Sequence, residues 1–341
     1  MDNRRKFIKK SVVAGLGISS GFNYSSTHAR GQVNRDLKLG IIGLDTSHSP
    51  AFTKYINDPE KPSMQGVQVT AAYPYGSTKI ESSASRIPEY IEEVKAMGVS
   101  IVDDIDSLID QVDGILLETN DGSLHLEQAM RVIKTGKPMF IDKPVAAGLE
   151  DVIRIYKAAN EHQVPMFSSS SLRFMKNAQE VRYEKVIGEI TGANTFSPEE
   201  WEPSHTDLFW YGIHGVEILY TIMGTGCQSI KRILTDNTDL VIGKWSGDRL
   251  GIFRGDLHKR QYYGGTAFGT KGIKEMEQFH GYGALLEKVV EFFRTGISPV
   301  DDAETVELYT FMEAADVSKN RNGEWIELKE VYDKAMEKSN K

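Results

Sequence analysis

Residues 37–48 read LKLGIIGLDTSH, and this stretch decides the fold that we expect. The apolar run 37–42 is typical of a buried parallel strand, and Gly43 places a tight turn at its end. A helix is predicted over residues 51–57. A strand, a glycine turn and a helix in this order form the first unit of a nucleotide-binding sheet, where a dinucleotide pyrophosphate binds at the helix N-terminus.

The chain then keeps alternating between the two kinds of element. Strands are predicted over residues 67–73, 99–102, 114–119, 138–142 and 165–168, and helices over 87–97, 105–109, 124–134 and 149–162. Strands and helices that alternate at this spacing form a parallel sheet with right-handed crossovers. The predicted fold class is therefore α/β, with a doubly wound Rossmann domain over residues 36–167.

The alternation stops after the serine run at residues 168–171. Strands are then predicted over 190–196, 229–235, 250–254 and 261–265, around one apolar helix over 208–223, with further helices over 282–295 and 302–321. Grouped strands of this kind indicate a mostly antiparallel sheet, hence an α+β domain, over residues 168–330. Two domains also suit a chain of 341 residues. Residues 331–341 are predicted to be a C-terminal tail.

The N-terminus, residues 1–30, reads as an export signal rather than part of the fold. Arg4 and Arg5 precede a short apolar stretch over 12–18, and small residues follow at 27–29. This order is typical of a signal peptide, and the arginine pair resembles a twin-arginine signal. A general secretory signal or a basic tail is the alternative. We expect a periplasmic or otherwise exported protein without a membrane-spanning segment in its mature form.

The charge and the cysteine count exclude several kinds of partner and site. The net charge is −8, whereas binding to nucleic acid or to an anionic membrane needs a positive field. Cys227 is the single cysteine, so neither an internal disulfide nor a cysteine-rich metal site can form. We expect Cys227 to be a buried, inert thiol.

The turn after the first strand departs from the G-x-G-x-x-G pattern that binds dinucleotides. Gly43 holds the first glycine position, but Asp45 and His48 stand at the other two. Asp45 would bring a negative charge close to the pyrophosphate, unless its side chain turns inward to cap the helix. We expect cofactor contacts from the turn residues Gly43, Asp45, Thr46, Ser47 and His48.

Further cofactor contacts are expected at the ends of later strands. Residues 73–79, after the second strand, read YPYGSTK and contain no carboxylate for the ribose hydroxyls. Ser77 and Lys79 could instead meet a 2′-phosphate, which would favour NADP over NAD, or could simply form a polar loop. Thr119, at the end of the strand over 114–119, is placed at the same edge of the sheet.

Two residues are candidates for catalysis. Asp142, Lys143 and Pro144 directly follow a buried strand, so Lys143 lies at the edge of the sheet where ligands bind. There it could bind a substrate hydroxyl and cofactor, with Asp142 beside it. His214 lies among small residues on the apolar helix and could move a proton near neutral pH. A satisfied core histidine is the alternative reading of His214.

These motifs, in this order, resemble the Gfo/Idh/MocA oxidoreductases, named for glucose–fructose oxidoreductase and inositol dehydrogenase. Residues 142–144 resemble the family's Glu-Lys-Pro motif, and Arg173-Phe174 its Arg-aromatic pair. His214 falls on the family's catalytic histidine. Residues 269–272 (GTKG) match a late turn, and residues 323–328 (GEWIEL) match the close of the fold. The resemblance covers the chain from Leu37 to Leu328.

The resemblance implies a Rossmann domain followed by an open sheet that carries substrate and builds homo-oligomers. It also implies hydride transfer between NAD or NADP and a carbon of a sugar, glycoside or cyclitol. Lys143 would orient the substrate hydroxyl and His214 would move its proton. Since no pool of free NAD(P)H is maintained outside the cytoplasm, an exported enzyme of this kind is expected to hold its cofactor tightly.

The candidate substrate residues lie in the second domain, and some depart from the family pattern. Trp210 stands where the family has Asp, four residues before the histidine. Glu217 could replace that carboxylate, while Trp210 could stack on the C–H face of a sugar. Arg173 and Trp201 complete the set of candidates.

Other readings of these residues stay open. Asp45, His48, His205 and Asp207 are ligand types for metals, but their spacing matches no known site, and we predict no metal. A lyase, hydrolase or epimerase acting on keto-sugars without net redox chemistry could use the same lysine and histidine. A carbohydrate-binding protein without catalysis is a third possibility, favoured by the altered turn and Trp210.

Overall fold

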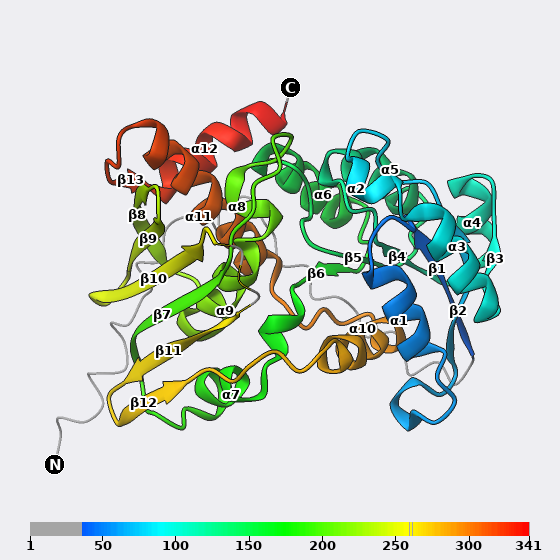
Figure 1. The fold of residues 1–341 in the computed structure, drawn as a ribbon, viewed down its shortest axis with the longest axis horizontal. Helices are drawn as coiled ribbons and strands as arrows, with labels where there is room; N and C mark the ends of the chain where they lie inside the picture. The colour runs from blue at the N-terminus through cyan, green and yellow to red at the C-terminus, as the bar shows by residue number, and fades with distance from the viewer. Residues whose placement is uncertain (1–35, 259, 261, 341) are drawn as a thin grey trace, which may run out of the picture.

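The computed structural model describes residues 36–258, 260 and 262–340. The predicted export signal over residues 1–30 lies outside the described residues. Two sheets lie side by side, each with its own helices (Figure 1). We call the lobe built on the N-terminal sheet the first lobe and the other the second lobe. No described helix is both long enough and apolar enough to cross a bilayer.

The first lobe contains a six-stranded sheet, in the order β3-β2-β1-β4-β5-β6. Every pairing in it is parallel, which confirms the predicted doubly wound fold. The strands are β1 (Leu37–Ile42), β2 (Val67–Tyr73), β3 (Ser100–Ile101), β4 (Gly114–Leu117), β5 (Met139–Ile141) and β6 (Met166–Ser168). The strand order reverses between β1 and β4, and ligands bind at such a switch point, outside the carboxyl ends of the strands.

The helices of the first lobe follow the predicted alternation. They are α1 (His48–Ile56), α2 (Glu81–Ala84), α3 (Ile87–Ala96), α4 (Ile105–Gln111), α5 (His125–Ile133) and α6 (Leu149–Glu161), with short 3-10 turns at Pro62–Met64 and Gly122–Leu124. Helix α1 begins three residues earlier than predicted, so His48 stands in its first turn. The N-terminus of α1 therefore opens directly onto the carboxyl edge of the sheet.

A helix from late in the chain completes the first lobe. Helix α10 (Gly283–Thr295) belongs by sequence to the predicted second domain, yet it packs beside α1 on the first sheet (Figure 1). Phe292 and Phe293 lie in the same apolar cluster as Phe52, Phe140 and Phe167. Burial of each such side chain contributes about 1.5–3 kcal/mol, so this packing fixes the connection that leads into α10.

The second lobe contains a seven-stranded sheet, in the order β12-β11-β7-β10-β9-β8-β13. Its strands are β7 (Ile190–Pro198), β8 (Cys227–Thr235), β9 (Thr238–Trp245), β10 (Arg249–Asp256), β11 (Gly264–Gly269), β12 (Gly272–Glu275) and β13 (Ile326–Glu327). Among the described strands only β7 and β10 pair in parallel, which confirms a mostly antiparallel sheet. Strands β9, β12 and β13 were not predicted; Asp236 and Asn237 join β9 to β8 in a tight hairpin.

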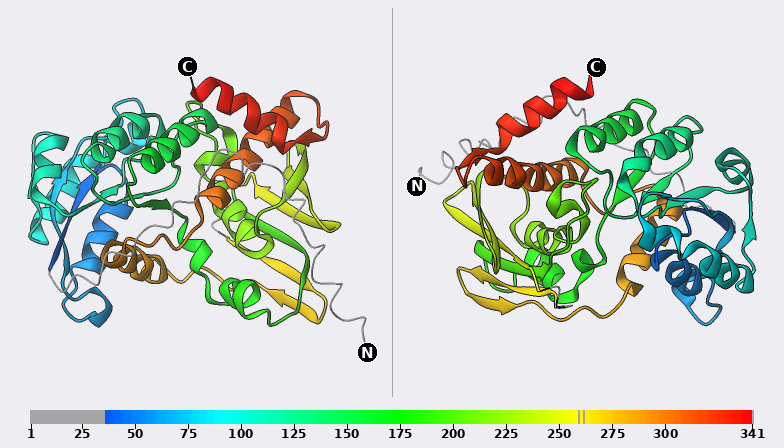
Figure 2. Two further views of the ribbon diagram at one scale, coloured as in Figure 1. Left: turned by 180° about the vertical axis from the view of Figure 1, so that it is seen from behind. Right: turned by 45° about the horizontal axis from the view of Figure 1, so that its top comes forward.

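Helices cover one face of this second sheet (Figure 2). They include α8 (Asp207–Trp210), α9 (Ile213–Met223) and α11 (Asp302–Asn320), preceded by the short segments Ser171–Phe174, α7 (Lys176–Gln179) and Glu180–Glu184. The single helix predicted over 208–223 is in fact two helices, which separate at Tyr211 and Gly212. The predicted C-terminal tail instead forms most of α12 (Leu328–Ser339), which packs against α6.

Candidate active site

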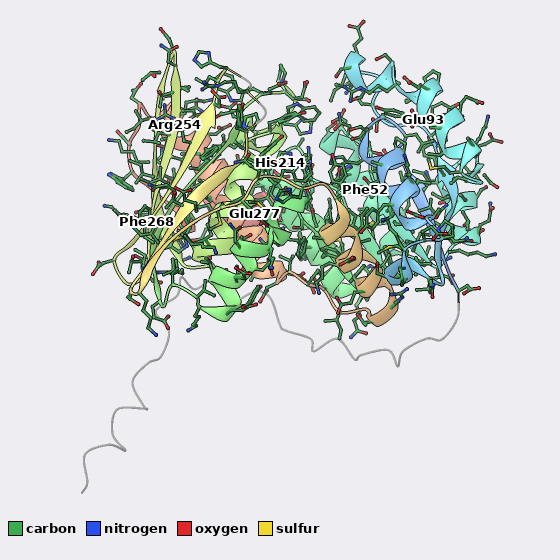
Figure 3. The ribbon with its side chains drawn as sticks, turned by 60° about the horizontal axis from the view of Figure 1, so that its bottom comes forward. Phe52, Glu93, His214, Arg254, Phe268 and Glu277 are labelled. Atoms are coloured by element: carbon green, nitrogen blue, oxygen red, sulfur yellow. The ribbon has the colours of Figure 1, made fainter. Side chains whose placement is uncertain are left out.

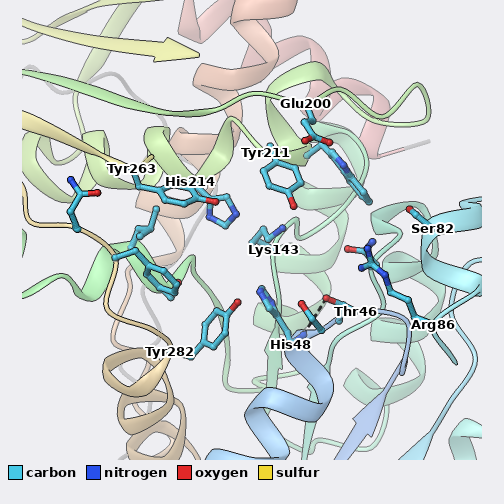
Figure 4. Close-up of a pocket in the computed structure, with 17 residues that line it drawn as sticks. Thr46, His48, Ser82, Arg86, Lys143, Glu200, Tyr211, His214, Tyr263 and Tyr282 are labelled. Carbon is cyan, nitrogen blue, oxygen red and sulfur yellow. Dashed lines mark hydrogen bonds between the residues drawn. The ribbon is translucent and has the colours of Figure 1, made fainter. Parts of the chain in front are cut away.

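A cavity of about 580 Å³ lies between the lobes at the carboxyl edge of the parallel sheet (Figure 4). We call it the interlobe cavity. The first lobe contributes His48 and Lys143 to its lining, and the second contributes Tyr211 and His214. Figure 3 shows His214 at the junction of the two lobes, far from the outer helix that carries Glu93. Cavities of this size and position are the usual binding sites for small molecules.

The turn after β1 is shaped by Gly43. Its φ of 93° is in the region that favours glycine, and a Cβ there would lie 2.6 Å from the backbone of Thr119. The following residues Thr46, Ser47 and His48 line the interlobe cavity. The turn therefore packs closely on the end of β4 and presents the N-terminus of α1 to a ligand.

Asp45 points away from the interlobe cavity. It is fully buried, and its carboxylate accepts hydrogen bonds from the backbone N–H of Ser77 at 3.1 Å and of Asn120 at 3.0 Å. Burial raises the pKa of Asp45, although these hydrogen bonds oppose the shift. The side chain turns inward, but it ties together the loops after β2 and β4 instead of capping α1. Its charge is therefore directed away from a pyrophosphate at the turn.

Ser77 and Thr119 do not line the interlobe cavity, contrary to what we expected. Ser77 is 2% exposed and donates a hydrogen bond to Asp121 at 2.7 Å. Its hydroxyl also accepts from the backbone N–H of Lys79, so Ser77 shapes its own loop. Thr119 is buried, and its carbonyl oxygen is 2.6 Å from Nε2 of His125. Both residues support the site from beneath.

His48 and Asp142 form a hydrogen-bonded pair at the floor of the interlobe cavity. Nδ1 of His48 lies 2.5 Å from the Asp142 carboxylate. The His48 ring stacks on Phe52 and meets the edge of Tyr282, which fixes its plane. Burial alone would raise the pKa of Asp142, but His48 and Lys143 together outweigh it and lower that pKa. Asp142 thus orients His48 at the turn.

Lys143 reaches the interlobe cavity from the end of β5. Its Nζ lies 5.4 Å from the centre of the Tyr211 ring, which comes from the second lobe. Burial lowers the pKa of Lys143, although Asp142 and Glu118 oppose the shift. A lysine with a lowered pKa exchanges protons more readily near neutral pH than an exposed one does.

His214 faces Lys143 from the first turn of α9 (Figure 4). Its Nδ1 lies 2.8 Å from the Ser170 hydroxyl, and the edges of Tyr211 and Tyr263 enclose the ring. Burial lowers the pKa of His214 well below its ordinary value, and Lys143 and His48 lower it further. His214 is therefore neutral near pH 7, which suits a base that accepts a proton.

The two tryptophans that we proposed for substrate lie in different places. Trp210 lines the interlobe cavity and packs against His205, with ring centres 5.1 Å apart. Trp201 is 47% exposed and donates a hydrogen bond to Glu199 at 2.6 Å. It lies outside the lining of the interlobe cavity. Only Trp210 can provide a stacking wall for a ligand there.

Arg173 and Glu217 do not line the interlobe cavity either, which corrects their assignment to substrate. Both are buried and form an ion pair with each other, and Arg173 also donates to Glu304 at 2.6 Å. Ser169 donates a further hydrogen bond to Glu217. Glu217 follows His214 by one turn of α9, but its carboxylate is used within the core, so it cannot replace the missing aspartate.

His205 and Asp207 likewise serve the fold. Nε2 of His205 accepts the backbone N–H of Gly122 at 3.0 Å, and Asp207 pairs with Arg232 at 3.0 Å and with Lys319. The four candidate metal ligands considered from the sequence, Asp45, His48, His205 and Asp207, are therefore not brought together. Cys227 is buried, as expected, and burial raises the pKa of its thiol.

The structure adds residues that sequence reasoning missed. Tyr211 and Tyr282 line the interlobe cavity, as do Tyr263 and Arg86. Burial raises the pKa of Tyr263 and of Tyr282 to about 12, so both phenols stay neutral donors. Only Tyr211 carried a signal, as the neighbour of Trp210 near His214. The others come from loops or from distant segments that only folding brings together.

Glu118 is the other missed residue, and it is buried directly beneath His48 and Asp142. It follows β4, is 0% exposed, and neither carboxylate oxygen has a hydrogen-bonding partner among the described residues. Burial, then Asp142 and Asp45, raises its pKa well above the ordinary value. An acid at the carboxyl end of a buried parallel strand was the signal that could have found it.

Fold and cavity together define a two-lobed protein with a cavity between a Rossmann sheet and a mixed sheet. Residues 37–170 match the model of the Gfo/Idh/MocA oxidoreductases, described as an oxidoreductase family with an NAD-binding Rossmann fold. The match spans the parallel sheet of the first lobe.

Two curated proteins match part of this chain. An uncharacterized oxidoreductase of Streptococcus pneumoniae is 25% identical over 129 residues, which are 36% of this chain and 35% of that protein. The 2,7-anhydro-N-acetylneuraminate hydratase of Escherichia coli is 31% identical over 111 residues, 31% of this chain and 29% of that protein. The match thus spans about a third of each relative or less.

Solved structures share the fold of both lobes. A probable dehydrogenase from Thermotoga maritima covers 86% of this chain and 100% of its own, with a TM-score of 0.71 and 18% identity. The scyllo-inositol dehydrogenase of Lactobacillus casei, solved with NAD(H) and scyllo-inositol, covers 86% of this chain and 99% of its own, with a TM-score of 0.67 and 14% identity. At these identities the likeness concerns the fold.

The residues of this edge fit a nicotinamide dinucleotide. Thr46 and Ser47 line the interlobe cavity at the N-terminus of α1, where the helix dipole favours an anionic phosphate. The carboxylate of Asp45, which threatened that site in the sequence, is buried and bonded to two backbone amides. Asn120 and Lys143 line the continuation of the cavity toward the second lobe.

Proposed function

We propose that the chain is an exported NAD(P)-dependent oxidoreductase that acts on a carbon of a sugar, glycoside or cyclitol. The observation that carries the proposal is the meeting of Lys143 and His214, from different lobes, in one cavity with the turn after β1. The family of the first lobe supports a nicotinamide cofactor. The cyclitol named with the L. casei structure supports the substrate class by analogy of fold.

A bound nicotinamide would supply the hydride chemistry, and the residues of the chain would manage the substrate and its proton. Lys143 binds the hydroxyl of the carbon that reacts and stabilises negative charge on its oxygen. His214 accepts the hydroxyl proton on Nε2 when Nδ1 donates to Ser170. For the reverse reaction the same nitrogen returns the proton.

The walls of the interlobe cavity suit a polyol. Tyr211, Tyr263 and Tyr282 present phenols, and Trp210 presents an aromatic face. Phenols that stay protonated donate hydrogen bonds to hydroxyl groups, while aromatic rings pack on C–H faces. Closure between two lobes also excludes water from the reacting atoms.

Export, tight cofactor binding and self-association complete the proposal. The arginine pair at residues 4–5 supports twin-arginine export, a route that carries folded proteins. An exported enzyme would retain its cofactor through successive substrates. The second sheet exposes Leu250 and Ile273, 49% and 66% exposed, which supports pairing of copies through that sheet.

One alternative has an observation of its own. The E. coli relative at 31% identity is named a hydratase, which favours a reaction without net oxidation. In that case Lys143 and His214 would move protons on a keto-sugar, as a lyase, hydrolase or epimerase does. The two functions differ in their products: net redox chemistry changes the oxidation state of the substrate, and the alternative does not.

The test is to purify the protein through its native export route, denature it and measure released nicotinamide dinucleotide by mass spectrometry. We expect near-stoichiometric NAD or NADP, and the mass of the released dinucleotide shows which of the two is bound. An empty protein that binds neither dinucleotide at millimolar concentration would overturn the redox proposal. Turnover of a keto-sugar by such an empty protein would establish the alternative.

A further inference from the structure

Three side chains, two buried and one part-buried, meet at the floor of the interlobe cavity, and their charges are not balanced by the contacts around them. They are His48 on α1, Glu118 after β4 and Asp142 after β5, which we call the His48 cluster. Each offers a ligand atom, and these atoms lie within 4.8 Å of one another. The cluster thus gathers residues from three neighbouring segments at the switch point of the sheet.

Glu118 is the member whose state requires an explanation. It is 0% exposed, and among the described residues neither of its oxygens accepts a hydrogen bond. A buried carboxylate without partners costs several kcal/mol, so it is normally paired, protonated or bound to a cation. Lys143 is a counter-charge that acts on Glu118, but the same lysine also acts on Asp142.

The neighbouring groups do not remove this excess of negative charge. Asp142 and Asp45 are further acids that act electrostatically on Glu118 and add negative charge around it. His48 already pairs with Asp142 through Nδ1. Three buried carboxylates therefore share one lysine and one histidine. A divalent cation placed between Glu118, Asp142 and His48 would neutralise the excess.

We propose that the His48 cluster binds a divalent first-row transition ion, such as Zn²⁺ or Mn²⁺, through His48 Nδ1 and the carboxylates of Glu118 and Asp142. One imidazole and two carboxylates form a donor set that such ions accept. Ligand atoms bonded at about 2.1 Å lie about 3.4 Å apart in a tetrahedral site. His48 and Asp142 would separate slightly and Glu118 would approach.

The place of the ion gives it a chemical role. His48 lines the interlobe cavity, whereas Glu118 and Asp142 lie beneath it, so the remaining coordination positions are on the substrate side. An ion there polarises a hydroxyl or carbonyl oxygen of the ligand next to Lys143. This role does not depend on the proposed redox reaction, since it would assist proton transfer in a lyase or hydratase equally.

The experiment measures metal binding directly. The tag-free mature chain is stripped with a chelator and dialysed, and Zn²⁺ or Mn²⁺ alone is added in a calorimetric titration. We expect one ion per chain, and at least tenfold weaker binding for Glu118→Gln. The matched control is Glu200→Gln, because Glu200 lines the same cavity outside the cluster; it should bind like the parent. No saturable binding, or equal loss in both variants, would overturn the proposal.

Two further measurements test the proposal even if a variant fails to fold. Pulsed electron paramagnetic resonance of the parent chain with Mn²⁺ should show coupling to a directly bound imidazole nitrogen, and its absence would overturn the proposal. The competing occupant of the cluster is a proton on Glu118. A protonated-carboxyl infrared band should disappear when Zn²⁺ is added, and a band that persists at saturating Zn²⁺ would identify the proton as the occupant instead.

Discussion

Two buried groups of charged residues lie close to the interlobe cavity, and they differ in how completely their charges are paired. In one, Arg173 joins Glu217 and Glu304, and Arg182 adds a second cation to Glu304; we call it the Arg173 cluster. The other is the His48 cluster, where Glu118 has no hydrogen-bonding partner among the described residues. The Arg173 cluster is a structural tie between segments of the second lobe.

The difference shows which buried charges serve the fold and which are available to a ligand. A charge whose hydrogen bonds are all made within the core has nothing left for substrate, as with Arg173 and Glu217. A charge buried without partners costs stability, and such groups concentrate where ligands bind. The sequence showed acidic and basic residues in both places and could not separate them.

The largest expected effect is on the Arg173 cluster. Arg173→Met should destabilise the protein by about 3–5 kcal/mol, because Glu217 and Glu304 would stay buried with their main partner removed. Urea unfolding followed by circular dichroism measures this loss. Arg173→Lys serves as the control and should recover part of the stability. A loss below about 1 kcal/mol in Arg173→Met would remove the contrast between the two clusters.

The next effect concerns catalysis and not stability. His214→Asn should lower kcat by about 10²–10⁴-fold, because the imidazole that accepts the substrate proton is replaced by a smaller polar side chain that cannot accept it. The measurement is the steady-state rate on whichever polyol the protein turns over. Unfolding in urea is the control and should change little. An unchanged rate would mean that His214 is a core residue.

The His48 cluster should respond in the opposite sense to the Arg173 cluster. In the chelated protein Glu118→Gln should raise the free energy of unfolding by about 1–2 kcal/mol, since it removes a buried, unpartnered acid. The pKa of Glu118 is raised on folding, so its contribution is most favourable at low pH and is lost as pH rises through the folded pKa. The difference in the free energy of unfolding between Glu118→Gln and the parent should therefore widen as pH rises. A difference that narrows would contradict a raised pKa for Glu118.

The pH dependence of the rate tests the role of His214 as the proton acceptor. Because burial lowers the pKa of His214, its neutral form persists below the ordinary value of about 6.5. The acid limb of kcat/KM for the oxidation direction should therefore lie below pH 6.5. Rates measured in overlapping buffers from acid to neutral pH provide the test. A limb above pH 7 would mean that another group controls the step.

The smallest effect separates the two tryptophans. Trp210→Ala should raise KM by about 10-fold, the equivalent of about 1.4 kcal/mol of aromatic packing on substrate. Trp201→Ala should leave KM unchanged, since Trp201 is exposed and bonded to Glu199 outside the interlobe cavity. Equal effects of the two substitutions would contradict the placement of Trp210.

The sequence alone determined the elements that local patterns control. Apolar runs and glycine turns predicted the parallel sheet of the first lobe, because alternation and turn chemistry act over a few residues. Lys143 could be placed at the edge of the sheet because it directly follows a buried strand. His214 could be proposed because it lies on an apolar helix between small residues.

Only the tertiary structure decided which side chains face a ligand, since direction and partners depend on segments far apart in the chain. Asp45 turned away because the loops after β2 and β4 offered two amides. Glu217 is unavailable to a ligand because it is paired with Arg173, which lies 44 residues away in the sequence. Glu118 became a candidate ligand only because folding brings ligand atoms of His48, Glu118 and Asp142 within 4.8 Å of one another. The balance of buried charge is a property of the folded chain, so no local pattern predicted it.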